Sequence, residues 1–391
     1  MGQSKKYQDL LPFCVTETQR TVVGLRSRGY TAIQAANQLG VAERNVHALC
    51  ARVAKIAARQ GHSPDHDMVH VVPDGFSVKG TSTLYKDGSP VMQWVKSTQD
   101  RERQMAMLLE AIESAHENLK PFERIKKPAG TDSDVLALLT ITDFHLGMHA
   151  CEAETGSKWD SQIAERVFLS SVADMIDATP PAKTGVFCQL GDFLHFDGLL
   201  AVTPTGGNLL DSDTRYSKLV EMTINVMTRA VEMMLEKFDK VVVIQAEGNH
   251  DLASSVWLRK HIKHVFSKNP RLEVIDNDFP YYAYLHGQTM LGFHHGHKVK
   301  MGGLQKLFSS EPRFREMWGK AKQCYIHTGH MHHERLVLGE DAGAIVEQHP
   351  TLSSSDSYSS RLGLLSLRGA KVITYHAAHG EIHRTTVRPI E

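Results

Sequence analysis

Five short motifs in the second half of this 391-residue chain gather carboxylate, imidazole and amide side chains. In order along the chain they are Asp143-Phe144-His145, Gly191-Asp192, Gly248-Asn249-His250-Asp251, His295-Gly296 and Gly329-His330-Met331-His332. A mixed set of nitrogen and oxygen ligands suits Mn²⁺, Fe²⁺ or Zn²⁺ and disfavours Ca²⁺, which prefers oxygen alone. We therefore expect two divalent metal ions, with Mn²⁺ favoured.

The spacing within the motifs indicates how two ions could share one site. In extended backbone, residues two apart project to the same side, so Asp143 with His145, and His330 with His332, are each expected to aim two donors at one place. A single carboxylate can bridge two cations, and Asp192, directly after a glycine, suits that role. Two metals about 3.5–4 Å apart can activate a water molecule and hold phosphate oxygens, which is the chemistry of phosphate-ester hydrolysis.

The elements that must position these residues alternate between strands and helices from Asp134 onward. Apolar runs at 135–142, 185–190 and 241–246 each end at a motif, and each is followed by a helical pattern, at 162–176, 217–238 and 254–266. Later strands are expected at 281–285, 289–293 and 324–328, with a final hairpin from 370–376 and 381–387. This pattern predicts an α/β catalytic domain over 131–391, with its site along one rim of the sheet.

The amino-terminal segment 1–62 reads as a small all-α helix-turn-helix domain. Thr31 and Gln34 fit a capping box that opens a helix ending at Leu39, Gly40 supplies the turn, and a second helix follows from about Ala42. This segment has nine Lys and Arg residues against three Asp and Glu, a net charge of +6, whereas the rest of the chain carries −6. The exposed face of the second helix is predicted to bind DNA through Arg44, Asn45, His47, Arg52 and Lys55. A small helical packing module is the alternative.

Residues 63–130 are interpreted as a connector. Short strands are expected at 69–72, 76–78 and 84–94, with turns at 73–75 and 86–88, followed by an exposed helix at 100–119 and a linker at 120–132. This segment indicates nothing about function.

Composition favours a cytoplasmic protein. No apolar run approaches membrane-spanning length, and the first residues lack the apolar core of a secretion signal, so no membrane partner is expected. The five cysteines are scattered and lack a Cys-x-x-Cys pair, so we expect reduced thiols.

In this order, the five motifs resemble those of the calcineurin-like metallophosphoesterase superfamily: Asp-x-His, Gly-Asp, Gly-Asn-His-Asp/Glu, His and Gly-His-x-His. The resemblance covers about residues 134–391 and implies an αββα sandwich of two stacked sheets flanked by helices. It implies that one metal binds Asp143, His145, Asp192 and His332, and the other Asp192, Asn249, His295 and His330. It also implies that His250 acts beside the leaving oxygen as an acid or charge stabiliser, with Asp251 orienting its ring.

One ligand needs a choice, because His294 and His297 flank His295. The ligand of the superfamily directly precedes a glycine, and strand alternation turns His294 away, so His295 is preferred.

The range of possible substrates is narrowed by a sequence difference from the protein phosphatases of this superfamily. Their phosphate-binding arginines, in Gly-Asp-x-x-Asp-Arg-Gly and Arg-Gly-Asn-His-Glu, are missing here. The segment from Asp197 to Tyr216 is long enough to form a wall over the metals, and Arg215 within it is either a phosphate contact or an ordinary surface arginine. His195, with His327 and His333, is a neighbour that contacts either substrate or nothing.

The chain is most similar to the DNA-repair exonuclease branch, including phage-encoded relatives. The leading hypothesis is a metal-dependent DNA nuclease or phosphodiesterase recruited to DNA by its amino-terminal module, because tethering raises the local concentration of phosphodiesters. One alternative is a small-molecule phosphodiesterase or phosphatase, and another is a DNA-binding regulator with a non-catalytic metal site. A homodimer is the expectation by analogy, since many helix-turn-helix proteins read paired half-sites.

Overall fold

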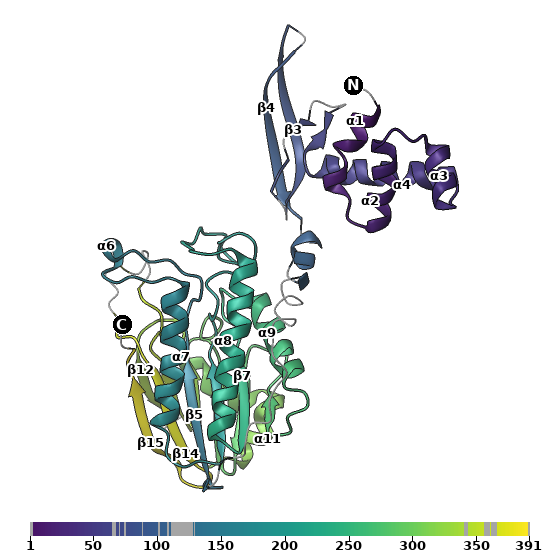
Figure 1. Ribbon diagram of the computed structural model, residues 1–391. Coiled ribbons are helices and arrows are strands. Elements are labelled where there is room, and N and C mark those ends of the chain that lie inside the picture. Colours follow the sequence, from purple (N-terminus) through teal and green to yellow (C-terminus); the bar gives the residue numbers. More distant parts are fainter. Residues whose placement is uncertain are drawn as a thin grey trace. The chain divides into compact units, whose positions relative to one another are not determined.

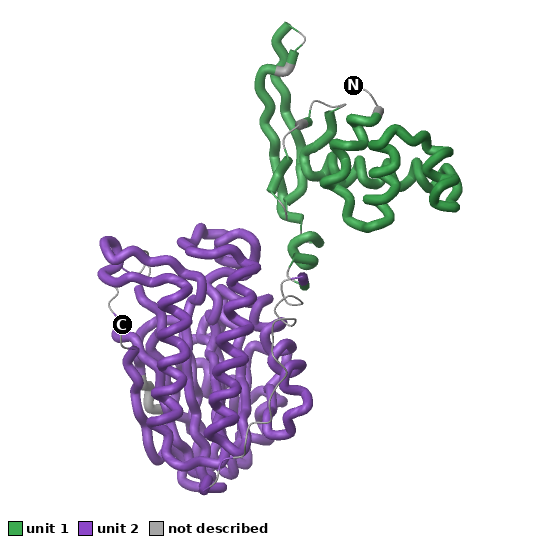
Figure 2. Tube along the Cα trace, in the orientation of Figure 1, with its two compact units in different colours: residues 1–109 green, residues 110–391 purple. Residues whose placement is uncertain are grey.

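The chain forms two compact units, residues 1–109 and 110–391 (Figure 2). The computed structural model describes residues 3–64, 68–69, 71–73, 76–87, 89–100, 102–107, 109–110, 128, 130–339, 343–355, 360 and 366–389. The predicted boundaries at 62 and 130 remain predictions.

The first unit begins with a small helical core. Its helices are α1 (Gln3–Gln8), the 3₁₀ turn η1 (Leu11–Phe13), α2 (Glu17–Ser27), α3 (Ala32–Leu39) and α4 (Glu43–Arg59). The capping box predicted for α3 is present, with Thr31 and Gln34 bonding reciprocally, and Gly40 takes the left-handed conformation with φ 66°. On α4, Val46 and Val53 are fully buried as the apolar spacing predicts. The predicted helices and turn are therefore present.

The same unit also contains strands, so as a compact body it is not all-α. The short strands β1 (His62–Ser63) and β2 (Met68–Val69) pair, and β3 (Phe76–Lys86) forms a long antiparallel ribbon with β4 (Ser89–Gln99). Both β1 and β3 contact α4. The expected short strands at 76–78 and 84–94 are thus parts of one hairpin, in which β3 continues past Gly80 with a shift of register between Val78 and Gly80.

Parts of the predicted connector lie outside the described residues. Of the expected helix at 100–119, residues 102–107 and 109–110 are helical. Residue 100 is described and is not helical, whereas residues 101, 108 and 111–119 of that range are not described. Asp74 and Gly75 of the first turn, Gly88 of the second turn, and most of the linker at 120–132 are not described either.

The second unit holds two sheets. The six-stranded sheet has the order β15-β14-β5-β6-β7-β8, and the five-stranded sheet has the order β12-β13-β11-β10-β9. Strands β5, β6, β7 and β8 run parallel to one another, whereas β14 pairs antiparallel with both β5 and β15. The first sheet comprises β5 (Val135–Ile141), β6 (Thr184–Gln189), β7 (Lys240–Gln245), β8 (Leu272–Val274), β14 (Ala370–His376) and β15 (Gly380–Val387); the second comprises β9 (Tyr282–His286), β10 (Thr289–Phe293), β11 (Gln323–Thr328), β12 (Arg335–Gly339) and β13 (Ala344–Gln348).

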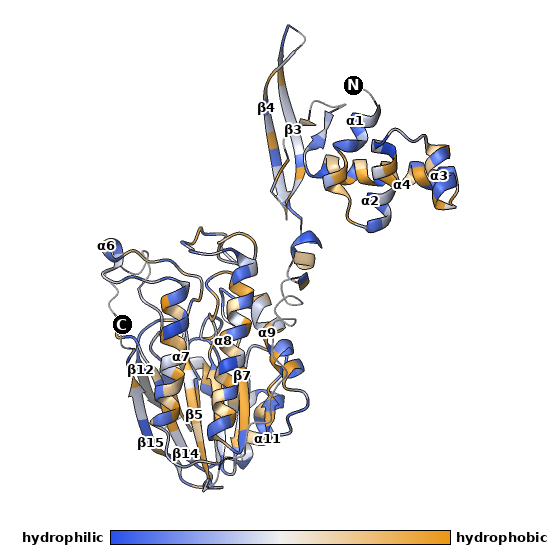
Figure 3. Cartoon of the chain, in the orientation of Figure 1, coloured by the Kyte–Doolittle hydropathy of each residue, from blue (hydrophilic) through white to orange (hydrophobic). Residues whose placement is uncertain are grey.

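The two sheets face each other across one buried apolar core. That core joins Leu138 of β5 and Ile244 of β7 to Leu291 and Phe293 of β10, so it takes side chains from both sheets. Figure 3 shows the hydrophobic character of β5 and β7.

Helices cover both outer faces of the paired sheets. On the first sheet these are α7 (Ser161–Asp177), α8 (Tyr216–Lys237) and α9 (Leu252–Val265), of which α7 and α8 lie in front of the strands in Figure 1. On the second sheet they are α10 (Met301–Ser310) and α11 (Pro312–Lys320); a short α6 (Glu152–Thr155) precedes α7. The expected αββα sandwich is confirmed.

Among the described residues, no helix combines the length and apolar character needed to cross a membrane.

Candidate metal centre

All seven predicted ligands lie just after the carboxyl ends of strands, and both sheets contribute. Asp143 and His145 follow β5, Asp192 follows β6 and Asn249 follows β7, all in the first sheet. His295 follows β10, and His330 and His332 follow β11, in the second sheet. The site therefore spans the rim where the two sheets meet, rather than the rim of one sheet.

The backbone at five of these seven ligands is left-handed, which corrects the expectation of extended segments. Positive φ angles occur at Asp143 (50°), His145 (49°), Asp192 (54°), His330 (74°) and His332 (58°). Such angles are uncommon for residues other than glycine and carry strain that the surrounding structure must offset. After β5, β6 and β11 the left-handed residues redirect the polar side chains, so the convergence of these five ligands does not come from strand alternation.

Asp143, His145 and His332 form the first group of donors. Nε2 of His332 lies 3.3 Å from Nε2 of His145 and 3.3 Å from Oδ1 of Asp143. Each of the three residues offers a ligand atom within 4.8 Å of the others. Burial lowers the pKa of His145, which keeps the ring neutral and its lone pair available.

The two oxygens of Asp143 have different surroundings. Oδ2 accepts hydrogen bonds from Oγ1 of Thr142 (2.6 Å) and from the backbone of His330 (2.9 Å). Oδ1 is buried and has no hydrogen-bond partner among the described residues. It faces ring nitrogens of His332 and, at 3.9 Å, of His295. A buried carboxylate oxygen without a donor is costly, and a cation at this position would satisfy it.

Asp192, His295 and His330 form the second group, and Asn249 joins it. Nε2 of His295 lies 3.1 Å from Oδ2 of Asp192 and 3.2 Å from Oδ1 of Asn249. At the other side of the ring, Nδ1 of His295 donates to the carbonyl of Leu190 at 2.9 Å. That bond fixes the ring orientation and turns Nε2 into the site, as a hydrogen bond to the second ring nitrogen does for metal-binding histidines.

The electrostatics of the second group favour positive charge. Burial lowers the pKa of His295, but the carboxylates of Asp192 and Asp143 outweigh that effect and raise the pKa to about 9. A proton or a metal cation between these groups supplies the charge they favour. His294, by contrast, turns its Nδ1 to the carbonyl of Pro280 (3.0 Å) and packs on Tyr281. His295 is therefore the histidine of this pair that faces the site.

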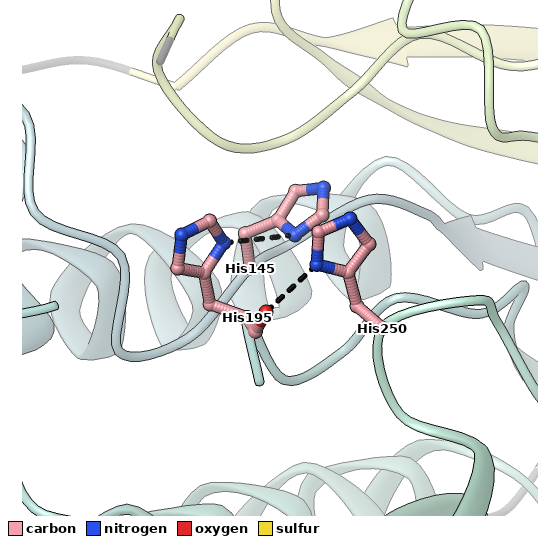
Figure 4. A group of neighbouring side chains, drawn as sticks. All are labelled: His145, His195 and His250. Atoms are coloured by element: carbon pink, nitrogen blue, oxygen red, sulfur yellow. Dashed lines mark hydrogen bonds between the residues drawn. The ribbon is translucent and has the colours of Figure 1, made fainter. Parts of the chain in front are cut away.

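His250 and His195 lie beside His145 of the first group (Figure 4). Nδ1 of His250 donates to the main-chain carbonyl of His195 at 2.7 Å, and the two rings stack with centroids 5.6 Å apart. Nδ1 of His195 lies 3.4 Å from Nδ1 of His145. The sequence left the role of His195 undecided. The structure places His195 beside His145 and His250, and its main-chain carbonyl fixes one tautomer of His250.

Asp251 does not orient the ring of His250, contrary to expectation. Its buried carboxylate accepts from four backbone amides, those of Gly248 (2.8 Å), Asp192 (3.2 Å), Phe193 (2.7 Å) and Leu194 (3.4 Å). Because these donors lie on two separate loops, Asp251 ties the loop after β6 to the loop after β7. The His195 carbonyl takes the orienting role instead.

The glycines of the motifs allow the ligands to approach closely. A Cβ atom on Gly248 would meet the backbone and carboxylate of Asp192, and one on Gly329 would meet Thr142 and Asp143. Gly-Asn and Gly-His are therefore steric requirements of the site.

The predicted phosphate contact and the predicted DNA contacts lie on exposed surface. Arg215 immediately precedes α8 and is exposed, so its role as a phosphate contact stays a prediction. On α4 the five predicted DNA contacts are all exposed on one helix. A groove of about 590 Å³ lies beside them and is lined by Asn45 and Arg52 of α4 and by Thr18 and Thr21 of α2.

A further buried group was not predicted from sequence. His327, Glu347 and His349 lie together in the second sheet, with Nδ1 of His327 3.0 Å from Nε2 of His349. Glu347 already contacts Nζ of Lys371 (2.6 Å) and Nη1 of Arg384 (2.7 Å). A divalent metal here would face two nearby cations, so we interpret the group as an ion cluster. Glu347 and Lys371 belong to no motif that could have indicated it.

No family model matches the chain, and no curated protein matches it. Among solved structures it is similar to a conserved uncharacterised protein and predicted phosphoesterase of Streptococcus pneumoniae, with 12% identity over 65% of this chain and 98% of that one (TM-score 0.26). It is also similar to vacuolar protein sorting 29 of Cryptosporidium parvum, with 14% identity over 66% and 100% (TM-score 0.28). For phosphopantetheinyl hydrolase of Mycobacterium tuberculosis the values are 11% identity over 59% and 93% (TM-score 0.27). Similarity this low supports no inference about activity.

Proposed function

We propose that this chain is a calcineurin-like metallophosphoesterase that hydrolyses phosphodiester bonds with two divalent metal ions, and that its substrate is DNA. The observation that carries the hydrolase proposal is the convergence of the ligands from five separate loops on the rim between the sheets. One ion would be held by Asp143, His145, Asp192 and His332, and the other by Asp192, Asn249, His295 and His330. When bound, the ions would supply Lewis acidity and lower the pKa of a water molecule.

The residues around the ions would orient the substrate and move one proton. His250 has its Nδ1–H bound to the His195 carbonyl, so its Nε2 is free to face the substrate. In its protonated form, Nε2–H would donate to the oxygen that leaves the phosphorus. Asp251 holds the two loops that carry Asp192 and His250 at a fixed separation.

DNA as the substrate is supported by the first unit. The exposed cations of α4 lie on a helix whose opposite face is buried, which is the arrangement of a helix that enters a major groove. We expect the cations to neutralise phosphates and to raise the time that the catalytic unit spends near phosphodiester bonds.

The test compares purified variants on end-labelled single- and double-stranded DNA with Mn²⁺, Mg²⁺ and Zn²⁺. We expect Mn²⁺-dependent cleavage, abolished in Asp192→Ala because a ligand shared by both ions is lost. His250→Ala should bind metal normally but reduce kcat by about 10²–10⁴-fold, the usual effect of losing a general acid. The control His264→Ala, an exposed histidine of α9, should cleave normally.

Absence of DNA cleavage throughout this panel would overturn the nuclease assignment. Hydrolysis of a nitrophenyl ester or a cyclic nucleotide, with DNA left intact, would replace it with a small-molecule phosphodiesterase. Tight DNA retention with neither activity would indicate a regulator.

A further inference from the structure

The loop that carries His330 and His332 is held at both ends. At its start, the backbone of Gly329 donates to the carbonyl of His295 (2.8 Å), and that of His330 donates to Asp143. At its exit, Nε2 of Gln348 donates to the carbonyl of His333 at 2.6 Å. The next residue, Glu334, reaches Nζ of Lys371 at 2.6 Å. Because both histidines have positive φ, the loop needs such restraints to keep its conformation.

Lys371 is an unusual anchor because it is almost fully buried, with 2% of its surface exposed. Its ammonium group lies 2.6 Å from Glu334 and 2.6 Å from Glu347. Glu347 is 3% exposed, and its carboxylate also accepts hydrogen bonds from both terminal nitrogens of Arg384, at 2.7 and 3.1 Å. Buried lysines are rare unless paired, and here the two carboxylates provide the pairing.

The residues of this cluster come from different sheets. Lys371 lies on β14 and Arg384 on β15, in the first sheet, whereas Glu347 lies on β13 and Glu334 directly precedes β12, in the second sheet. Tyr375 of β14 adds a second cross-link, with its hydroxyl 3.1 Å from Nε2 of His327 on β11. The cluster therefore joins the two sheets behind the loop that carries His330 and His332.

This arrangement matters because the ligands are divided between the same two sheets. Asp143, His145, Asp192 and Asn249 move with the first sheet, and His295, His330 and His332 move with the second. Any slip between the sheets, or any loosening of the loop exit, changes the distance between the two sets of donors. Metal affinity depends steeply on such distances, since ligands must be held within a few tenths of an ångström.

We propose that Lys371 is a positioning residue for the metal centre. Its ion pair with Glu334 fixes the exit of the loop from His330 to His332. Its ion pair with Glu347 fixes the position of the second sheet, which carries that loop, relative to the first sheet. The inference rests on the proposed function, because a well-positioned metal centre matters for hydrolysis. Its test measures loop exchange and Mn²⁺ binding and does not require hydrolysis. Lys371 itself is not one of the proposed metal ligands.

The test uses the full chain and three variants. Glu334→Gln removes the half-exposed carboxylate at the loop exit while leaving Lys371 paired with Glu347, so folding should be retained. Lys371→Met removes the anchor itself. Arg384→Gln is the matched control, because it takes a cation from Glu347 without touching Glu334.

The first measurement is amide hydrogen exchange, followed by mass spectrometry without added metal, in peptides spanning 329–335. We expect exchange at least fivefold faster in Glu334→Gln and Lys371→Met, and near wild-type exchange in Arg384→Gln. The second is titration with Mn²⁺ alone, where Glu334→Gln should raise the Kd about tenfold, the lower end of the effect of losing a residue that orients ligands.

Wild-type exchange in Glu334→Gln, or an equal effect in Arg384→Gln, would overturn the proposal and leave the cluster a general link between sheets. Binding of Mn²⁺ without any phosphodiester hydrolysis would instead reject the proposed function and leave this inference intact. The exchange measurement still decides the matter if the wild-type chain binds no Mn²⁺.

Discussion

At the scale of single residues, the site depends on backbone that lies too close to a ligand for any side chain. Gly248 lies against Asp192 and Gly329 lies against Asp143, so a methyl group at either place would displace a carboxylate. The five left-handed ligands carry a second constraint, because their conformation is stable only while the surrounding hydrogen bonds hold it.

We predict that Gly248→Ala destabilises the fold by about 1–3 kcal/mol, the usual cost of overpacking, and weakens Mn²⁺ binding. Urea unfolding and a Mn²⁺ titration measure the two effects. The control is Gly302→Ala on α10, where an added methyl group meets nothing within 4 Å. It should stabilise by up to about 1 kcal/mol, since alanine is the better helix former. Normal metal binding by Gly248→Ala would contradict the steric account.

The types and order of the ligands could be predicted from the sequence, but their geometry could not. Gly-Asp and Gly-His identify Asp192 and His330, whereas nothing in those letters indicates positive φ, which non-glycine residues seldom adopt. The role of His195 was equally hidden, because it acts through its main-chain carbonyl, a group every residue has.

At the scale of elements, helix ends show how local chemistry sets boundaries. Asp160 caps α7 by accepting from the backbone of Ile163 at 2.9 Å, and Lys158 lies 3.5 Å from its carboxylate. Burial raises the pKa of Asp160, but the Ile163 hydrogen bond and the Lys158 charge outweigh it, so the pKa is lowered. A lowered folded-state pKa means that the cap stabilises α7 above the unfolded-state pKa and that this stability is lost as pH falls through the folded-state pKa.

We therefore predict that Asp160→Ala lowers the free energy of unfolding by about 1 kcal/mol at pH 7. The difference from wild type should shrink as the pH is lowered toward 3. Urea unfolding at several pH values checks this, with the exposed Asp174→Ala on the same helix as control, expected to change stability by less than about 0.5 kcal/mol. A deficit that grows with acidity would contradict the assigned sign.

Most elements that carry ligands were predictable, because long apolar runs end in polar motifs. The prediction for β10 matched residue by residue, and those for β5, β6 and β7 differed by a residue at their ends. Helices α10 and α11 were missed, although Pro312 at the start of α11 is a recognised helix-start signal. Strand β13 was missed because its pairing partners, β11 and β12, are set by contacts distant from any local pattern. The prediction of two stacked sheets came from the family resemblance, since strand patterns alone do not specify which strands pair.

At the scale of the whole molecule, the two units divide the work we propose. The first unit has exposed cations on α4, and the second holds Asp143 and Asp192, the acidic ligands of the proposed metal centre. We predict that the triple variant Arg44→Ala, Arg52→Ala, Lys55→Ala binds DNA more weakly, with the slope of log affinity against log salt reduced by up to about one per cation removed. Hydrolysis of a small nitrophenyl ester should not change.

Fluorescence anisotropy across a range of salt concentrations measures that slope. A matched substitution of the exposed Arg229, on α8 of the second unit, should leave it unchanged. Unaltered DNA affinity in the triple variant would reassign the first unit to protein contacts.

The most direct test of the metal centre is anomalous diffraction from crystals of the full chain grown with Mn²⁺. Our account predicts two peaks about 3.5–4 Å apart, bridged by the carboxylate of Asp192, with His145 and His332 at one ion and His295 and His330 at the other. A single peak, or peaks remote from Asp192, would contradict the two-metal site on which the proposed hydrolysis depends.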